Sequence, residues 1–220
     1  MTEIYTCGIA FILEGDTEKI FYYRVLCYFV EQHPGAKIVK CTDKANGETY
    51  YSVQYGERNV LIKFNVVGTI SQITHSVSWF QNRCYKKHRG LKWKVFLCYD
   101  TDSYNNDIGK FYEGDWKELR KSIEKNRNCS VTDLAAQADI EDIMLLDSDG
   151  VFKYLDMLPV PIPNGKKGKR KMKKIFRMKG SGYAYHEGNR AVSLIDSLDF
   201  KKIISLSDIP FSEVEKSLLD

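Results

Sequence analysis

Short apolar runs that alternate with amphipathic segments are the feature that most limits what this chain can fold into. Residues 8–13 form a continuous apolar run, and residues 60–67 and 93–99 are similar. Runs of this length are typical of strands that are buried on both faces. Between them, residues 19–30 and 70–85 carry apolar side chains at helical spacing. Strands that alternate with helices predict βαβ units, in which helices cover a mainly parallel sheet.

The remaining segments extend this pattern. Residues 36–41 suggest a further strand, whereas residues 43–58 are polar and indicate a loop or a weak hairpin. Residues 116–125 are amphipathic at helical spacing, and further helices are predicted over residues 140–146, 151–158, 190–198 and 211–219. We therefore expect an α/β core over residues 1–135 and a helical extension over residues 136–220.

The composition is typical of a soluble globular protein. Hydrophobic residues make up 43% of the 220 residues and aromatic residues 13%, which excludes intrinsic disorder as the main state. No apolar run approaches the roughly 18 to 20 residues that cross a bilayer, and the first residues lack a signal-peptide pattern. The six cysteines show no CxxC spacing, so we expect reduced thiols and no zinc cluster. These features predict a cytoplasmic protein with no membrane partner.

Charge is concentrated in one basic segment, residues 163–179, which holds nine basic residues and no acidic one. Taking these nine from the 33 basic residues leaves 24 against 29 acidic ones, so the remaining chain is mildly acidic. Such a segment favours polyanions, and nucleic-acid phosphates are the first expectation. The alternative is a solvated loop, but Gly165 and Gly168 would keep the segment open for binding. The nine residues are Lys166, Lys167, Lys169, Arg170, Lys171, Lys173, Lys174, Arg177 and Lys179.

Acidic side chains follow two of the predicted strands. Glu14 comes directly after the first apolar run, and Asp100 and Asp102 follow the run at residues 93–99. Because the carboxyl ends of parallel strands share one edge of a sheet, these three carboxylates are expected to lie close together. In extended geometry Asp100 and Asp102 would project from the same side. Oxygen-only clusters suit Mg²⁺ or Mn²⁺, although solvated acids at loop starts are the alternative.

Two motifs extend this observation to a known family. Residues 12–19 read ILEGDTEK and residues 96–102 read FLCYDTD. Together they resemble the signature motifs of the Toprim domain, which topoisomerases, DnaG-type primases, RecR-type repair proteins and OLD-type nucleases share. The Glu-Gly-x-Thr-Glu form is most similar to the OLD and RloB-like branch, many of whose members belong to phage-defence systems. The resemblance covers roughly residues 8–160 and implies a Rossmann-like, mainly parallel sheet flanked by helices, with a helical C-terminal extension.

The resemblance also implies roles for single residues. Glu14 would be the metal-binding glutamate, and Asp100 and Asp102 would be the metal-binding Asp-x-Asp pair. Glu18 is similar to an additional catalytic acid of the nuclease branch, or else it is a first-turn acid that interacts with the helix dipole. Glu141 would contribute another catalytic carboxylate, with Asp142 as second choice and a plain surface acid as the alternative.

The function implied by the resemblance is metal-dependent hydrolysis of phosphodiesters in DNA or RNA, transfer RNA included. The protein would then be an endonuclease effector of a bacterial anti-phage defence system, with Mg²⁺ or Mn²⁺ as cofactor. A P-loop sequence is absent, so any ATPase sensor would be a separate partner, and a homodimer stays open. The alternatives are a non-catalytic Toprim module that binds nucleic acid or a partner protein, and a small RNA-maturation nuclease. Tyr183 and Tyr185 would either stack on bases or pack in the core.

Overall fold

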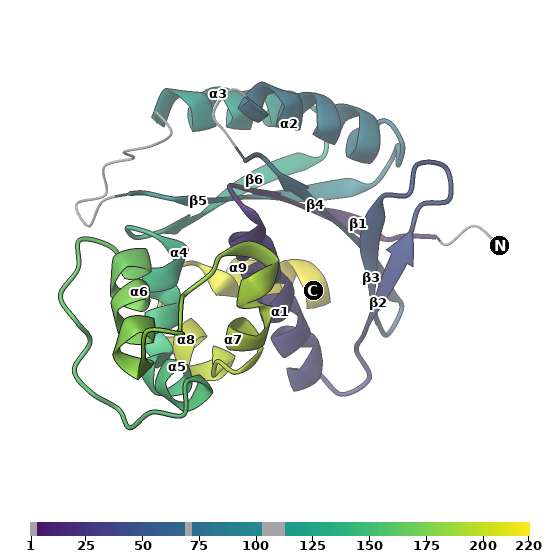
Figure 1. The fold of residues 1–220 in the computed structure, drawn as a ribbon. Helices are drawn as coiled ribbons and strands as arrows, with labels where there is room; N and C mark the ends of the chain where they lie inside the picture. Colours follow the sequence, from purple (N-terminus) through teal and green to yellow (C-terminus); the bar gives the residue numbers. More distant parts are fainter. Residues whose placement is uncertain (1–3, 69–71, 103–112) are drawn as a thin grey trace.

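The computed structural model describes residues 4–68, 72–102 and 113–220. Its centre is a six-stranded sheet with the strand order β2-β3-β4-β1-β5-β6 (Figure 1). Four neighbouring strands, β4, β1, β5 and β6, run parallel, whereas β2 and β3 pair antiparallel at the other end. The strands are β1 (Cys7–Leu13), β2 (Lys37–Thr42), β3 (Thr49–Tyr55), β4 (Arg58–Val66), β5 (Lys92–Asp100) and β6 (Cys129–Ala136).

The predicted class, a mixed α/β fold with a mostly parallel sheet between helices, is confirmed, but two strands were missed. The segment predicted as a loop or weak hairpin contains β3, in which Ser52 and Val53 are buried while its ends are partly exposed. Strand β6 lies at the sheet edge, and most of its residues are only partly buried. Edge strands of this kind lack a continuous apolar run, so periodicity alone does not reveal them.

Helices cover both faces of the sheet (Figure 1). On one face lie α2 (Ile73–Trp79), which continues as a π-helix over Phe80–Tyr85, and α3 (Glu113–Glu124). On the other face lie α1 (Asp16–Gln32) and the helices of the C-terminal third. These are α4 (Ile140–Met144), α5 (Ser148–Tyr154), α6 (Gly168–Lys179), α7 (Val192–Asp196), α8 (Phe200–Leu206) and α9 (Phe211–Leu219).

The larger of two hydrophobic clusters joins the strands to the C-terminal helices. Phe11 of β1 stacks on Phe96 of β5, with ring centroids 5.2 Å apart. The ring centroid of Phe21 in α1 lies 5.4 Å from that of Phe200 and 6.3 Å from that of Phe211. Helices far along the chain therefore pack directly on α1. Burying one such side chain stabilises the fold by about 1.5 to 3 kcal/mol. One continuous core therefore includes residues from both predicted segments, 1–135 and 136–220.

The basic segment is not an open loop over most of its length, which corrects that expectation. Residues from Gly168 onward form α6, and three apolar side chains at helical spacing, Met172, Ile175 and Phe176, are buried against the core. This contact with the core stabilises α6, because a short helix gains more stability from packing its apolar face than from the intrinsic helix propensity of its residues.

Two carboxylates hold the amino end of α6. The Gly168 amide donates to Asp142 Oδ2 at 2.6 Å, and the Lys169 amide donates to Asp139 Oδ2 at 3.0 Å. Negative charge at a helix amino terminus satisfies unpaired N–H groups and interacts favourably with the helix dipole. A Cβ at Gly168 would lie 2.1 Å from the Asp142 nitrogen, so only glycine permits this approach.

All six cysteines are free thiols, as predicted. Burial raises the pKa of the Cys84 and Cys98 thiols, which keeps both neutral and suits a packing role. Within the described ranges, no helix combines the length and the apolar character that crossing a membrane requires.

Substituting alanine for Gly168 should lower the free energy of unfolding by about 1 to 3 kcal/mol, because the added methyl group forces α6 away from α4. The control is Gly182→Ala, since a Cβ there meets nothing within 4 Å. Urea unfolding of both variants measures the difference. Equal effects of the two substitutions would show that α6 does not approach α4 this closely.

Candidate functional site

The ends of β1 and β5 lie side by side, as predicted from the motifs that follow them. The two strands pair in parallel, with Leu13 opposite Cys98. The Glu14 amide donates to the Cys98 carbonyl at 3.2 Å, and the Asp100 amide donates to Glu14 Oε2 at 3.4 Å. Glu14 is 5% exposed. The pairing therefore places two carboxyl groups, Glu14 and Asp100, at one buried edge of the sheet.

Glu18 joins this edge from the first turn of α1. Gly15 precedes the helix, and a Cβ on it would lie 2.8 Å from Glu18 Oε2, so the carboxylate folds back over the glycine. Glu18 is 7% exposed, which places it inside the site and not on the solvent face of the helix. Its position in the first turn also allows a favourable interaction with the helix dipole.

A third strand end supplies Asp139 and Glu141, which follow β6. Both side chains are 3% exposed. The Tyr185 hydroxyl donates to Glu141 Oε1 at 2.8 Å, and Asp139 accepts from the Asp142 amide at 3.0 Å as the N-cap of α4. The sequence analysis did not select Asp139 as a site residue. An aspartate directly before an apolar helical segment is nevertheless a recognisable N-cap signal.

Asp142 has another role than the sequence suggested, whereas Tyr185 packs in the core, one of its two expected roles. Asp142, the second-choice acid, accepts from the Gly168 amide and pairs with Lys171 at 2.6 Å, so it holds α6 in place. Tyr185 is 6% exposed, which leaves no face for stacking on a base. Its hydroxyl serves Glu141 instead.

Asp102 departs most from its expected geometry. Its φ of 60° lies in the left-handed region, so the chain is not extended at Asp102, although both Asp100 and Asp102 line one cavity. Its amide donates to the Ala138 carbonyl at 2.9 Å, and Ala138 has a similar φ of 63°. The Asp102 carboxylate forms an ion pair with Lys167. Left-handed backbone at non-glycine residues is costly and is concentrated at functional sites.

A cavity of about 540 Å³ opens between these groups. Its volume lies in the range of small-molecule sites. The lining contains eight acidic side chains and two lysines, so its formal charge is strongly negative. The charged lining residues are Glu14, Asp16, Glu18, Asp100, Asp102, Asp139, Glu141, Glu187, Lys167 and Lys169.

Burial and mutual repulsion change the protonation of this cluster. Burial raises the pKa of Asp100 far above its usual range, and the negative charges of Glu18 and Glu14 raise it further. Asp100 Oδ1 is buried and has no hydrogen-bond partner in the described part of the chain. Burial also raises the pKa of Glu141 to about 7, with a further contribution from Asp139, whereas the hydrogen bond from Tyr185 lowers it. Asp100 is therefore a neutral acid at pH 7, and Glu141 titrates near pH 7.

The expected Mg²⁺ or Mn²⁺ cofactor is not supported at Glu14, Asp100 and Asp102. Across residues 4–68, 72–102 and 113–220, no three acidic, histidine or cysteine side chains come together in a way that could hold a metal ion. The Asp102 carboxylate is instead engaged by Lys167. The donor set does not fit Mg²⁺ or Mn²⁺.

The nine basic residues divide into two groups. Lys167, Lys169, Lys171 and Lys179 form ion pairs with acidic side chains of this chain. The others, Lys166, Arg170, Lys173, Lys174 and Arg177, are exposed. Binding of nucleic acid by this segment stays a prediction, and it now concerns mainly the exposed group.

Comparisons with known proteins do not place the chain in a family. No family model matches it, and no curated protein matches it. Among solved structures, it is similar to a futalosine hydrolase mutant of Helicobacter pylori, with a TM-score of 0.32, 8% identity, and 99% of this chain and 100% of that chain covered. A 5'-methylthioadenosine/S-adenosyl homocysteine nucleosidase of Helicobacter pylori gives a TM-score of 0.27, 10% identity, and coverage of 88% and 79%. The corresponding nucleosidase of Campylobacter jejuni gives 0.25, 14%, and 96% and 93%.

These findings correct the resemblance to the Toprim domain. Neither a family model nor a curated sequence supports a Toprim protein. The expectation of a metal-dependent endonuclease in an anti-phage defence system is therefore wrong, and so are Mg²⁺ or Mn²⁺ as its cofactor. TM-scores this low do not indicate a shared fold, so no substrate or activity is transferred from those proteins to this chain.

The substitution Asp100→Asn should stabilise the protein at pH 8 by about 1 to 3 kcal/mol. The raised pKa keeps Asp100 protonated in the folded protein, whereas the unfolded chain loses this proton at about pH 4. The folded state thus binds the extra proton, and its stability falls as the pH rises from about 4 toward the folded pKa. An amide has no such proton, so the gain should disappear near pH 4. Urea unfolding at both pH values measures it.

Asp208→Asn is the matched control, because Asp208 is exposed. It should show no stabilisation that grows with pH. An Asp100→Asn protein that is no more stable than the wild type at pH 8 would mean that Asp100 is ionised in the folded state.

Proposed function

We propose that this cavity is the active site of a hydrolase that uses carboxyl groups for general acid–base catalysis. The observation that carries the proposal is the burial of the Asp100 carboxyl among other acidic side chains, which raises its pKa. Pairs of titratable groups whose surroundings separate their pKa values are characteristic of acid and base roles. The proposal applies to the residues of the cavity and does not involve a metal.

Asp100 is the proton donor. A leaving group needs a proton as its bond breaks, and Asp100 retains one at neutral pH because burial and the charges of Glu14 and Glu18 oppose ionisation. Its carboxyl lines the cavity, and its buried Oδ1 atom makes no hydrogen bond within the described residues.

Glu141 is the proton acceptor. A catalytic base works best when its pKa is near the working pH, and the pKa of Glu141 is raised to about 7. Tyr185 holds the Glu141 carboxylate through a 2.8 Å hydrogen bond and is therefore a positioning residue. In this role Glu141 removes a proton from the attacking water.

The charge of the cavity indicates the class of bond. An acidic, largely buried pocket stabilises positive charge that develops during a reaction. Cleavage of a glycosidic bond passes through a transition state that resembles an oxocarbenium ion, and it uses one carboxylic acid and one carboxylate. A cavity of about 540 Å³ accommodates one small glycoside. We therefore assign a glycosidic bond in a small substrate as the target.

The test is a panel of nucleosides and 4-nitrophenyl glycosides, assayed for release of base or nitrophenol at pH 5 to 9. The wild type should hydrolyse at least one member, and Asp100→Asn should lower kcat by about 10² to 10⁴, as loss of a general acid does. The Asp208→Asn protein should retain full activity. Absence of hydrolysis across the panel, or full activity of Asp100→Asn, would overturn the proposal.

Tyr185→Phe should move the pH profile of kcat/KM. Activity requires ionised Glu141, so it should rise through about pH 7 in the wild type. Removing the Tyr185 hydrogen bond, which lowers the pKa of Glu141, should move this rise to higher pH. An unchanged rise in Tyr185→Phe would exclude Glu141 as the group that titrates.

A further inference from the structure

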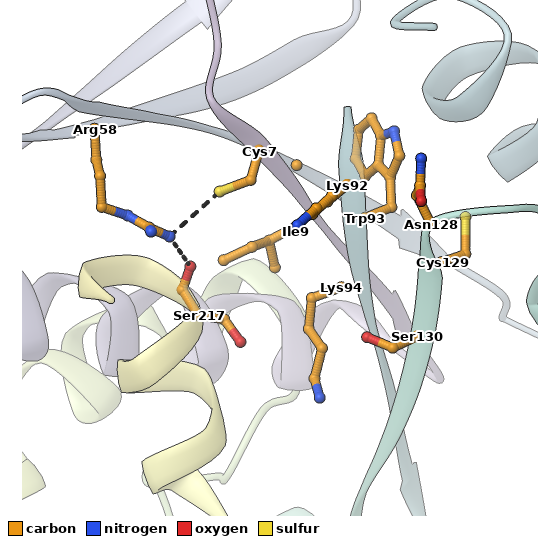
Figure 2. A pocket seen from close by; sticks show the side chains of 11 residues that line it. Cys7, Ile9, Arg58, Lys92, Trp93, Lys94, Asn128, Cys129, Ser130 and Ser217 are labelled. Carbon is orange, nitrogen blue, oxygen red and sulfur yellow. Dashed lines mark hydrogen bonds between the residues drawn. The ribbon is translucent and has the colours of Figure 1, made fainter. Parts of the chain in front are cut away.

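A second cavity, of about 420 Å³, lies at the amino ends of the parallel strands, the sheet edge opposite to the acidic site. Strand register explains its lining, since Cys7 pairs with Lys92 and Ile9 with Lys94. Residues two apart on a strand share one face, so these four side chains point to the same side of the sheet. Figure 2 shows Arg58 on one side of this space and Ser130 on the other, with Ile9, Lys92 and Lys94 between them.

Arg58 is the most informative group in this cavity. Its Nη2 atom donates to the Ser217 carbonyl near the end of α9 at 3.2 Å and to Cys7 Sγ at 3.4 Å (Figure 2). Its Nε atom is buried and has no hydrogen-bond partner among the described residues. In the same part of the chain, no acidic side chain forms an ion pair with Arg58. Arg58 lines the cavity and is partly exposed, so an anionic ligand there would pair with its guanidinium charge.

The neighbouring lysines determine the charge that such a ligand needs. Lys94 is partly compensated by Glu213, whose carboxylate lies 3.6 Å from Nζ. Lys92 is exposed, and no acidic partner within 4.0 Å is found for it over the described ranges. Arg58 and Lys92 therefore leave two positive charges at one cavity, which match a phosphate monoester with its charge near −2 at pH 7.

The uncharged wall indicates that the ligand has an apolar part. Cys7, which is partly exposed, supplies apolar surface next to the buried Ile9, and Ser130 adds one hydroxyl on the far side (Figure 2). Pockets of this size are typical of small molecules held by apolar walls and a few polar groups. We propose that this cavity binds a small organic phosphate, with the phosphate at Arg58 and Lys92 and the apolar part against Cys7.

The test uses phenyl phosphate as the probe, titrated calorimetrically at 0.15 M salt so that long-range attraction is screened. The wild type should bind it at one saturable site. Arg58→Gln and Lys92→Gln should each weaken binding about tenfold or more, since each removes a charged hydrogen bond. Lys166→Gln is the matched control, because it removes an exposed charge from the basic segment, and it should leave binding unchanged.

Three results would overturn the proposal. One is the lack of saturable binding by the wild type. Another is equal weakening by Lys166→Gln, which would indicate attraction to overall charge. The third is inorganic phosphate binding as tightly as phenyl phosphate, which would exclude a role for the apolar wall. If Arg58→Gln fails to fold because Arg58 holds the end of α9, Lys92→Gln decides the outcome, since Lys92 is exposed.

Discussion

Burial of several carboxyl groups at neighbouring strand ends is the constraint on which the site depends. Parallel pairing of β1 with β5 and of β5 with β6 places Glu14, Asp100, Asp139 and Glu141 at one sheet edge. Like charges that are removed from water cannot all remain ionised, so at least one group keeps its proton. Asp100 is the group whose pKa is raised most clearly, by burial and by the charges of the neighbouring carboxylates. Asp102 and Asp142 are paired with Lys167 and Lys171 instead.

The ion pairs of Lys167 and Lys171 help to hold the basic segment beside the acidic cavity. The amino end of α6 approaches α4, where Asp139 and Asp142 accept its first amides. This contact requires glycine at position 168 and brings Lys167 beside the cavity. The C-terminal helices thus complete both the hydrophobic core and the charged site, and Tyr185 in the loop after α6 reaches Glu141.

The sequence predicted the features that depend on local pattern. Apolar runs that end in acids located β1 and β5 and placed Glu14 and Asp100 at adjacent strand ends. It did not reveal β6 or α6, because an edge strand and a strongly basic helix are stabilised by contacts with distant residues. Nor could it show that Asp102 has a left-handed backbone or that Asp139 is buried, because a left-handed φ and a carboxylate–amide contact across 30 residues leave little trace in local pattern. The two motifs suggested a metal site that the side-chain geometry does not support.

NMR of side-chain carboxyl carbons measures directly whether Asp100 is protonated in the folded protein. Aspartate labelled at its side-chain carboxyl carbon gives one resonance per residue, and Asp100→Asn identifies that of Asp100. If Asp100 is protonated, one aspartate resonance should lie at the position of a protonated acid at pH 7 to 8, and this resonance should be absent from the Asp100→Asn protein. If every aspartate resonance instead titrates near the usual pKa of about 4, Asp100 is ionised at pH 7 and is not a buried neutral acid.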